Sequence, residues 1–222
     1  MPDDAALHQR QLQAEAMLRQ AGIMPVLTVD SVEQGLRTVQ ALADGGLRTI
    51  ELTLRTPAAL DALAAIKDRF ADVRVGAGTV LEPAQVDAVE ELGADFIVTP
   101  GVSPLLLDAL LQSSLPIVPG AATPSELLAL QARGLHVAKL FPAATLGGVA
   151  MLKALQGPLP KMQLCANGGV EEATAAAYLA LPNVPCVGGS WMVPKDWLAR
   201  GDYASVREAA ARACAIVAAR AG

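Results

Sequence analysis

Short apolar segments rich in β-branched residues recur along the chain, and longer stretches with helical spacing of apolar positions separate them. This alternation is typical of βαβ units, whose strands form a parallel sheet. Eight such units favour a closed barrel over an open, doubly wound sheet. The pattern therefore predicts the α/β class and a single (β/α)8 TIM barrel. We expect its strands near residues 24–29, 47–53, 73–77, 96–99, 116–118, 137–141, 162–166 and 184–188.

Several predicted helices begin with the same signal, a serine or threonine followed by proline. A hydroxyl at the N-cap accepts a hydrogen bond from an unpaired backbone N–H, and proline fits the first helical position. The three pairs are Thr56-Pro57, Ser103-Pro104 and Thr123-Pro124. Further helices are expected at 4–20 and 203–220. Because no linker interrupts the pattern, we predict one domain over 1–222, with the N-terminal helix of residues 1–22 covering one end of the barrel.

Composition and charge narrow the class of protein. Hydrophobic residues make up 53% of the chain but aromatic residues only 3%, so the core must be mainly aliphatic. The net charge is −5 and the 17 basic residues are scattered, which argues against nucleic acid or an anionic membrane as partner. The start of the chain, with Asp3 and Asp4, lacks the layout of a signal peptide, and the three cysteines form no CxxC pair. We therefore expect a cytoplasmic protein, and with two histidines we expect no histidine-rich metal site.

Lys139 differs from the other four lysines because it lies in the middle of the predicted sixth strand. A buried strand is an unfavourable place for an unpaired charge. Desolvation favours the neutral form of an amine, and only the neutral amine attacks a carbonyl. Lys139 is therefore a candidate nucleophile. The alternative is a lysine whose stem lines the barrel and whose ammonium group pairs with a carboxylate.

Polar residues occupy one face of the predicted second strand, where Glu51, Thr53 and Arg55 alternate with aliphatic residues. Side chains alternate between the two faces of a strand, so these three should point into the barrel and rise toward its C-terminal mouth. Barrel enzymes have their active sites at that mouth. A carboxylate there can move protons, and a guanidinium can bind a carboxylate through two hydrogen bonds. The alternative is an internal ion pair between Glu51 and Arg55.

Three other strand ends carry residues suited to a substrate. The third strand runs into Gly78-Thr79, which should place a hydroxyl at the mouth beside a glycine that permits close approach of the backbone. Gly168-Gly169 follows the seventh strand, and Gly188-Gly189-Ser190 ends the eighth. The loops after strands seven and eight are the recurrent phosphate site of (β/α)8 enzymes, because backbone N–H groups and a helix N-terminus bind the anion there. The two glycine pairs together predict a phosphate or a similar anion.

Taken together, these segments resemble one known family, the 2-keto-3-deoxy-6-phosphogluconate (KDPG) aldolases, which overlaps with the 4-hydroxy-2-oxoglutarate aldolases. The resemblance covers nearly the whole barrel. Each motif alone is weak, but their occurrence together and in this order is highly specific. The motifs are Glu51-Leu52-Thr53-Leu54-Arg55-Thr56, Gly76-Ala77-Gly78-Thr79-Val80, Thr99-Pro100-Gly101, Lys139-Leu140-Phe141-Pro142-Ala143, Gly168-Gly169 and Gly188-Gly189-Ser190-Trp191.

The resemblance implies a class I aldolase, usually a homotrimer, that uses no metal or other cofactor. Such an enzyme cleaves KDPG, a small-molecule 2-keto acid, to pyruvate and glyceraldehyde 3-phosphate in the Entner–Doudoroff pathway. Carried over to this sequence, Lys139 would form the Schiff base, and Glu51 would move protons through a water. Arg55 and Thr79 would hold the pyruvate carboxylate. It also implies that Pro100 and Phe141 contact the substrate. The residues that would bind the phosphate are Gly168, Gly169, Gly189 and Ser190.

Two positions depart from the family's usual pattern. Asn167 stands where a threonine usually precedes the glycines after strand seven, and Ala144 stands where the family often has glutamate. Asn167 would lie near the substrate and bears on the choice of aldehyde.

Other functions stay open: an aldolase for 4-hydroxy-2-oxoglutarate or a related 2-keto-3-deoxy sugar acid, a phosphate-binding barrel isomerase or epimerase, and a barrel that only binds a phosphorylated keto acid. A metal-dependent epimerase would need inward histidine and aspartate ligands, which the predicted strands lack.

Overall fold

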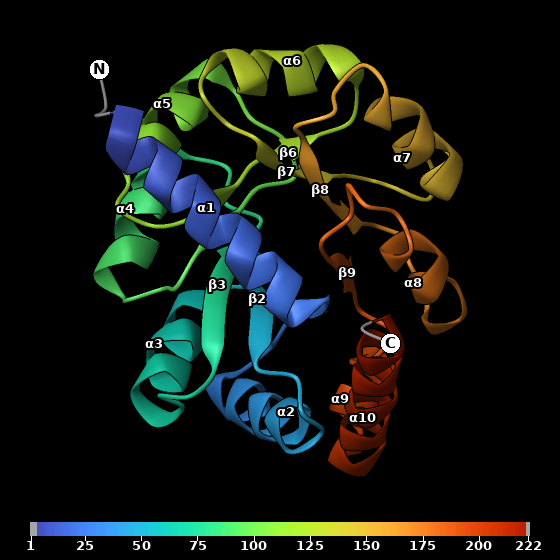
Figure 1. The fold of residues 1–222 in the computed structure, drawn as a ribbon. Coiled ribbons are helices and arrows are strands. Elements are labelled where there is room, and N and C mark those ends of the chain that lie inside the picture. The colour runs from blue at the N-terminus through green and yellow to red at the C-terminus, as the bar shows by residue number, and fades with distance from the viewer. Residues whose placement is uncertain (1–3, 221–222) are drawn as a thin grey trace.

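A computed structural model describes residues 4–220, in which strands and helices alternate (Figure 1). Residues 1–3 and 221–222, which complete the predicted domain and include Asp3, lie outside the described residues. The strands are β1 (Ile23–Leu27), β2 (Thr49–Thr53), β3 (Arg74–Gly78), β4 (Ile97–Val98), β5 (Ile117–Val118), β6 (Gly120–Ala121), β7 (Val137–Leu140), β8 (Gln163–Asn167) and β9 (Val187–Gly189). The helices are α1 (Asp4–Ala21), α2 (Val32–Asp44), α3 (Ala59–Arg69), α4 (Pro83–Glu91), α5 (Pro104–Gln112), α6 (Pro124–Ala132), α7 (Gly148–Gln156), α8 (Glu172–Leu179), α9 (Lys195–Ala199) and α10 (Tyr203–Arg220).

The sheet closes on itself at Pro119. In the order of the sheet β5 stands at one end and β6 at the other, and along the chain only Pro119 separates them. Because proline has no backbone N–H, the ladder changes partner there: β5 pairs with β4, and β6 pairs with β7. The N–H of Lys139 donates to the Pro119 carbonyl at 2.8 Å. The predicted barrel of parallel strands is therefore confirmed, and its fifth strand consists of two short segments.

Aliphatic side chains on the outer faces of the strands pack against the helices. Ile50 and Leu52 of β2 and Val75 of β3 are almost fully buried, and they belong to one apolar cluster with Leu63 and Ile66 of α3. Burial of such a side chain contributes roughly 1.5–3 kcal/mol relative to leaving it exposed. The even residues of β2 therefore face the helices, as its alternating pattern predicts, and the odd residues are left to face the barrel interior.

A second apolar cluster fills the N-terminal half of the barrel interior. Helix α1 crosses that end of the barrel (Figure 1) and contributes Ala14, Met17 and Leu18 to the cluster. Gln11 of α1 ties the helix to the strands, because its side-chain oxygen accepts from the backbone N–H groups of His136 and Val137, each at 2.9 Å. The strand residues of the cluster are Met24, Phe96, Val98, Val118, Val137, Cys165 and Cys186. One end of the barrel is therefore sealed, and the opposite end is left as the mouth.

The predicted helix caps hold at two of the three serine- or threonine-proline pairs. The Ser103 hydroxyl accepts from the Leu106 N–H, and the Thr123 hydroxyl accepts from the Glu126 N–H, each at 3.2 Å. The prediction for Thr56 is wrong, because α3 begins at Ala59 and its N-cap residue has no side-chain hydrogen bond. The Thr56 hydroxyl instead donates to the Val29 carbonyl at 2.6 Å and ties the loop after β2 to the loop after β1.

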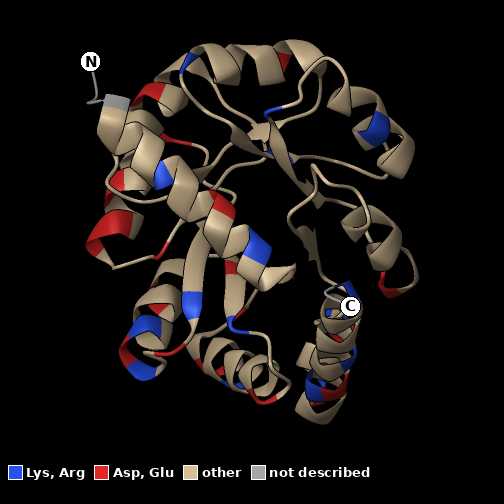
Figure 2. Cartoon of the chain, viewed as in Figure 1, with Lys and Arg blue, Asp and Glu red and all other residues tan. Residues whose placement is uncertain are grey.

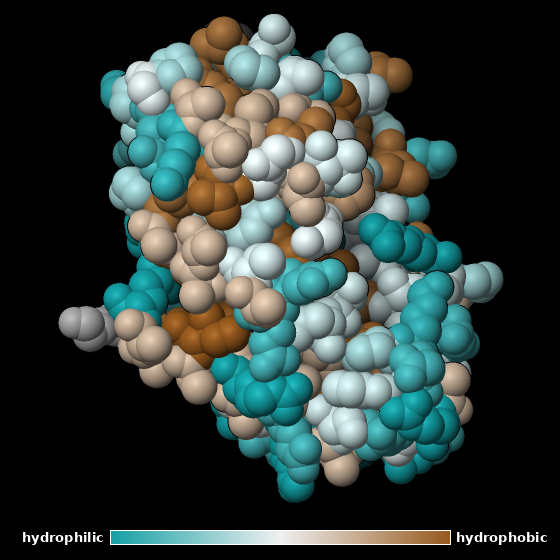
Figure 3. Space-filling model, turned by 90° about the vertical axis from the view of Figure 1, so that its right-hand side faces the viewer, coloured by the Kyte–Doolittle hydropathy of each residue, from teal (hydrophilic) through white to brown (hydrophobic). Residues whose placement is uncertain are grey.

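Charged residues of both signs are mixed over the helices, as Figure 2 shows. On the side of the molecule in Figure 3, hydrophobic residues lie among neutral ones in the upper part, and hydrophilic residues dominate the lower right. Within residues 4–220, no helix has the length and apolar character needed to cross a membrane.

Candidate active site

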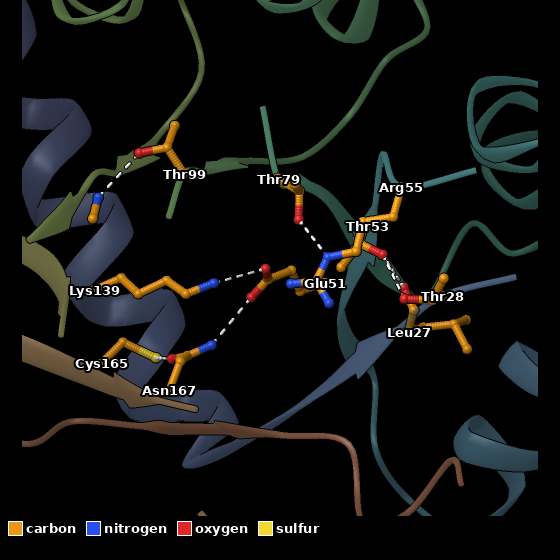
Figure 4. Close-up of polar contacts among 11 residues, drawn as sticks. Leu27, Thr28, Glu51, Thr53, Arg55, Thr79, Thr99, Lys139, Cys165 and Asn167 are labelled. Atoms are coloured by element: carbon orange, nitrogen blue, oxygen red, sulfur yellow. Dashed lines mark hydrogen bonds and ion pairs between the residues drawn. The ribbon is translucent and has the colours of Figure 1, made fainter. Parts of the chain in front are cut away.

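Lys139 and Glu51 meet inside the barrel, from β7 and β2 (Figure 4). Lys139 Nζ lies 3.0 Å from Glu51 Oε1, and the two side chains are 4% and 0% exposed. In every other ion pair of residues 4–220, both side chains are at least 22% exposed. A buried pair must overcome the desolvation of two charges, so it is a poor choice for stability alone. The predicted inward directions of both residues agree with this contact.

Glu51 fits beside β3 because that strand presents a glycine to it. A Cβ atom on Gly78 would lie 2.4 Å from Glu51 Oε1, and a Cβ atom on Gly76 would lie 2.3 Å from the Phe96 ring. Both glycines therefore face the barrel interior, while Val75 and Ala77 face the helices. Any larger residue at position 78 would displace the carboxylate.

A second hydrogen bond reaches Glu51 from β8. The Asn167 side-chain amide donates from Nδ2 to Glu51 Oε2 at 3.3 Å, and its Oδ1 accepts from the Cys165 thiol at 3.1 Å. Cys165 and Cys186 lie within the barrel interior and are almost fully buried, as expected for small filling residues. Burial raises the pKa of the Cys186 thiol, and the neighbouring Cys165 raises it further. The buried Cys186 thiol is thus kept in its protonated form.

Arg55 and Thr79 follow the C-terminal ends of β2 and β3, on the side of the mouth, and Figure 4 shows the contact between them. Arg55 Nε donates to the Thr79 hydroxyl at 3.1 Å. Alternation along β3 would place Thr79 on the outer face with Ala77, but Thr79 has a left-handed backbone, with φ of 59°. That conformation is unfavourable for a β-branched residue and turns its hydroxyl toward Arg55. Thr53, which follows Glu51 on the inward face of β2, donates to the Leu27 carbonyl at 3.0 Å.

A cavity of about 520 Å³ opens above Lys139 at the C-terminal ends of the strands. Its volume is within the usual range of small-molecule sites. Seven of the residues predicted from the sequence line it, namely Arg55, Lys139, Phe141, Gly168, Gly169, Gly189 and Ser190. Lys139 Nζ also lies 5.3 Å from the centre of the Phe141 ring, within the range of a cation–π contact.

The other predicted site residues lie just outside the cavity wall. Glu51 is beneath Lys139, and Thr79 is reached through Arg55. Pro100 is not a lining residue. It packs against Gly120, because a Cβ atom on Gly120 would lie 2.3 Å from the Pro100 carbonyl carbon. A larger hollow of about 1000 Å³ lies along α1 and α5. Its wall contains the buried Arg10, which donates to a backbone carbonyl, and the exposed ion pair of Asp108 and Arg133, but no buried ionisable pair like that of Lys139.

The glycines at the mouth fit backbone conformations and contacts that other residues disfavour. Gly168 and Gly169 have φ of 92° and 75°, in the left-handed region. A Cβ atom on Gly189 would overlap the Trp191 ring. The two glycine pairs, from the ends of β8 and β9, line the same part of the cavity as Ser190, so the backbone there can come close to a ligand.

Two further residues line the cavity, Lys195, which the sequence did not single out, and Trp191, the last residue of the Gly188-Gly189-Ser190-Trp191 motif. Lys195 begins α9 and makes no ion pair among the described residues, so it contributes a positive charge to a wall that also contains the carboxylate of Glu171. The indole Nε1–H of Trp191 is buried without a hydrogen-bond partner in the described chain. A lysine in a loop between proline and aspartate carries no signal that separates it from an ordinary surface lysine. Within residues 4–220, no group of three or more histidine, cysteine or acidic side chains could hold a metal ion.

Comparison with known proteins gives one consistent result. The family model "KDPG and KHG aldolase" matches residues 14–209. The 2-dehydro-3-deoxy-phosphogluconate aldolase of Pseudomonas aeruginosa is 44% identical over 90% of this chain and 91% of its own. The KHG/KDPG aldolase of Escherichia coli K12 is 42% identical over 90% and 94%.

Solved structures agree with the sequence relatives. A KDPG aldolase of Legionella pneumophila, with pyruvate captured as a covalent carbinolamine intermediate, superposes with a TM-score of 0.87 at 39% identity and covers 90% of this chain and 97% of its own. The KDPG aldolase of Zymomonas mobilis with 3-phosphoglycerate gives 0.85 at 34% identity, over 90% and 94%. The chain belongs to the KDPG and KHG aldolase family.

Proposed function

We propose that this protein is a class I aldolase that cleaves KDPG to pyruvate and glyceraldehyde 3-phosphate through a Schiff base on Lys139. The observation that carries the proposal is the buried contact between Lys139 and Glu51, directly beneath a cavity at the barrel mouth. The names of the relatives support the substrate, and the carbinolamine in the Legionella structure supports the type of intermediate.

The first stage forms the Schiff base. A proton passes from the Lys139 ammonium group to Glu51, and the neutral amine attacks C2 of the keto acid. The carbonyl oxygen takes a proton from Glu51 as the Nζ–C2 bond forms, which gives a carbinolamine. Glu51 then removes a proton from the nitrogen and delivers it to the new hydroxyl, which leaves as water. The 3.0 Å contact keeps the two groups within reach for each transfer, directly or through one water.

The second stage breaks the C3–C4 bond. Glu51, now a carboxylate, removes the C4 hydroxyl proton through a water while the iminium nitrogen accepts the electrons of the breaking bond. Glyceraldehyde 3-phosphate leaves, and an enamine of pyruvate stays on Lys139. Glu51 returns its proton to C3, and water hydrolyses the iminium to release pyruvate and restore the lysine.

Binding residues sit at opposite parts of the cavity in this proposal. Arg55, oriented by Thr79, binds the keto-acid carboxylate, and the Phe141 ring forms an apolar wall near Lys139. The glycine pairs and Ser190 receive the phosphate, and Lys195 adds positive charge at that end. For Pro100, a role in substrate binding rests on the motif alone.

For 4-hydroxy-2-oxoglutarate the chemistry at Lys139 is the same, so that substrate is the second candidate, favoured by the relatives that carry both names.

We also propose a cytoplasmic homotrimer. The three cysteines are free, which fits a reducing compartment. Three strongly exposed leucines support a subunit interface: Leu81 precedes α4, while Leu105 and Leu128 lie in α5 and α6, and all three are more than half exposed. Exposed apolar side chains on successive elements of one barrel are candidates for burial against a second copy of the chain.

Pyruvate with borohydride should reduce the Schiff base and leave a stable adduct on Lys139, because the imine is the species that borohydride traps. Mass spectrometry of the digested protein locates the adduct. Lys139→Ala should accept no adduct and lose cleavage activity. Adduct formation at another lysine, or activity that survives Lys139→Ala, would remove Lys139 from the mechanism.

Glu51→Gln should lower kcat by roughly 10²–10⁴, because a positioned acid–base group contributes about that much. The amide keeps the size of the side chain but leaves Lys139 without its buried carboxylate partner, so the urea midpoint should also fall, and kcat is compared on protein that is fully folded without urea. Steady-state kinetics and urea unfolding on the same preparation separate the two effects. An unchanged kcat would exclude Glu51 as the proton carrier.

Lys195→Ala should raise KM for KDPG about fivefold, because one exposed charge contact is worth about 1 kcal/mol. The KM for 4-hydroxy-2-oxoglutarate, which has no phosphate, should stay unchanged. Lys153→Ala, on the exposed face of α7, is the matched control and should alter neither KM. Equal kcat/KM of the wild-type enzyme for the two substrates would contradict a phosphate site at the glycine pairs.

A further inference from the structure

Both carboxylate oxygens of Glu51 have a side-chain partner, and the two partners differ in chemistry. Oε1 accepts from the Lys139 ammonium group at 3.0 Å, and Oε2 accepts from the Asn167 amide at 3.3 Å (Figure 4). Lys139 can give up a proton, whereas a side-chain amide cannot at ordinary pH. The carboxylate is therefore held between one partner that exchanges protons and one that only donates a fixed hydrogen bond.

The surroundings of Asn167 fix which end of its amide faces Glu51. The Cys165 thiol donates to Oδ1, which leaves Nδ2 for Glu51; the reversed amide would set two oxygens against each other. Asn167 is only 2% exposed, and a Cβ atom on Gly188 would lie 2.1 Å from its Nδ2. Because Gly188 of β9 has no side chain, the Asn167 amide of β8 has room beside it.

We propose that Asn167 is a positioning residue that holds Oε2 of Glu51, so that proton transfer with Lys139 and the substrate runs through Oε1. The inference rests on the proposed function, because it assigns Glu51 the proton-transfer role. An oxygen that accepts a fixed amide hydrogen bond is a poorer proton acceptor than one that faces the reacting nitrogen.

The charged and titratable groups around Glu51 come from several strands. Lys139 of β7 contacts it directly, Cys165 of β8 contacts Asn167, and Cys186 lies close enough for Glu51 to raise the pKa of its thiol. Arg55 extends from β2 itself toward the mouth. Of these groups, Lys139 alone hydrogen-bonds to the carboxylate in addition to Asn167, so a substitution of Asn167 changes one of the two contacts.

The test is the exchange of the pyruvate methyl protons for deuterium, followed by NMR as a function of pD. This half-reaction needs the Schiff base and a base that removes a C3 proton, but it needs no aldehyde and no phosphate site. Asn167→Leu removes the donor at similar volume, and Asn167→Asp replaces it with a second carboxylate. Both should lower the exchange rate at its optimum by roughly 10- to 100-fold, as expected for a lost hydrogen bond to a charged group.

The acid limb of the profile, where the exchange rate falls as the pD is lowered, gives a sharper readout than the rate at the optimum. Loss of a hydrogen-bond donor to a carboxylate disfavours its charged form, so the limb should move to higher pD in Asn167→Leu. Asn167→Asp should move it further, because two carboxylates in one site resist ionising together. The half-saturating concentration of pyruvate should stay within about twofold, since Asn167 acts through Glu51 rather than on the keto acid.

Asn183→Leu is the matched control. Asn183 is also a buried asparagine, but it donates to the Leu152 carbonyl at 3.0 Å and is not a lining residue of the cavity. It should lose stability and keep the wild-type acid limb. An unmoved limb in both Asn167 variants, or a loss of pyruvate affinity with the limb unmoved, would overturn the positioning role. Absence of exchange in the wild-type enzyme would instead overturn the proposed function.

Discussion

The contact between Lys139 and Glu51 is the feature around which the barrel interior is organised. Two opposite charges, 4% and 0% exposed, lie 3.0 Å apart on strands that are distant in the sequence. Removal of one partner from such a pair leaves an uncompensated buried charge, which typically costs 3–5 kcal/mol. Replacement of both by aliphatic residues is often neutral or stabilising. The pair therefore has its explanation in chemistry, and the neighbouring glycines and Asn167 are arranged to accommodate it.

The barrel divides into a sealed half and a reactive half. Below the pair, α1 and the inward side chains of the strands form a dry apolar cluster, where Gly76 makes room for the Phe96 ring. Above it, polar side chains and glycines surround a cavity of about 520 Å³. Lys139 sits at the boundary, because it lines the cavity while its amine bonds to the fully buried Glu51. This position holds the amine in one orientation and limits access of water to one side.

Much of this arrangement follows from local patterns in the sequence. The spacing of apolar segments predicted the barrel, and the alternation along β2 placed Glu51 inside and Ile50 outside. The unusual position of Lys139 in an apolar strand identified it as the candidate nucleophile. The predicted directions of the side chains are confirmed because strand alternation depends only on neighbours along the chain, while the nucleophilic role of Lys139 stays a prediction.

Features that depend on contacts between distant segments could not be predicted in this way. The left-handed backbone of Thr79 breaks the alternation of β3, and Thr56 bonds the loop after β1 instead of capping α3. The hydrogen bond from Asn167 to Glu51 joins residues 116 positions apart. Lys195 reaches the cavity through the path of the loop after β9, which its immediate neighbours do not specify.

The central claim is that the Lys139 amine, held beside Glu51, bonds covalently to the keto carbon of the substrate. A crystal structure of the protein soaked with pyruvate tests it most directly. The account predicts continuous density between Lys139 Nζ and C2 of pyruvate, with Glu51 still within hydrogen-bond reach of that nitrogen. Pyruvate bound in the cavity without a bond to Lys139, or a Lys139 side chain turned away from Glu51, would contradict it.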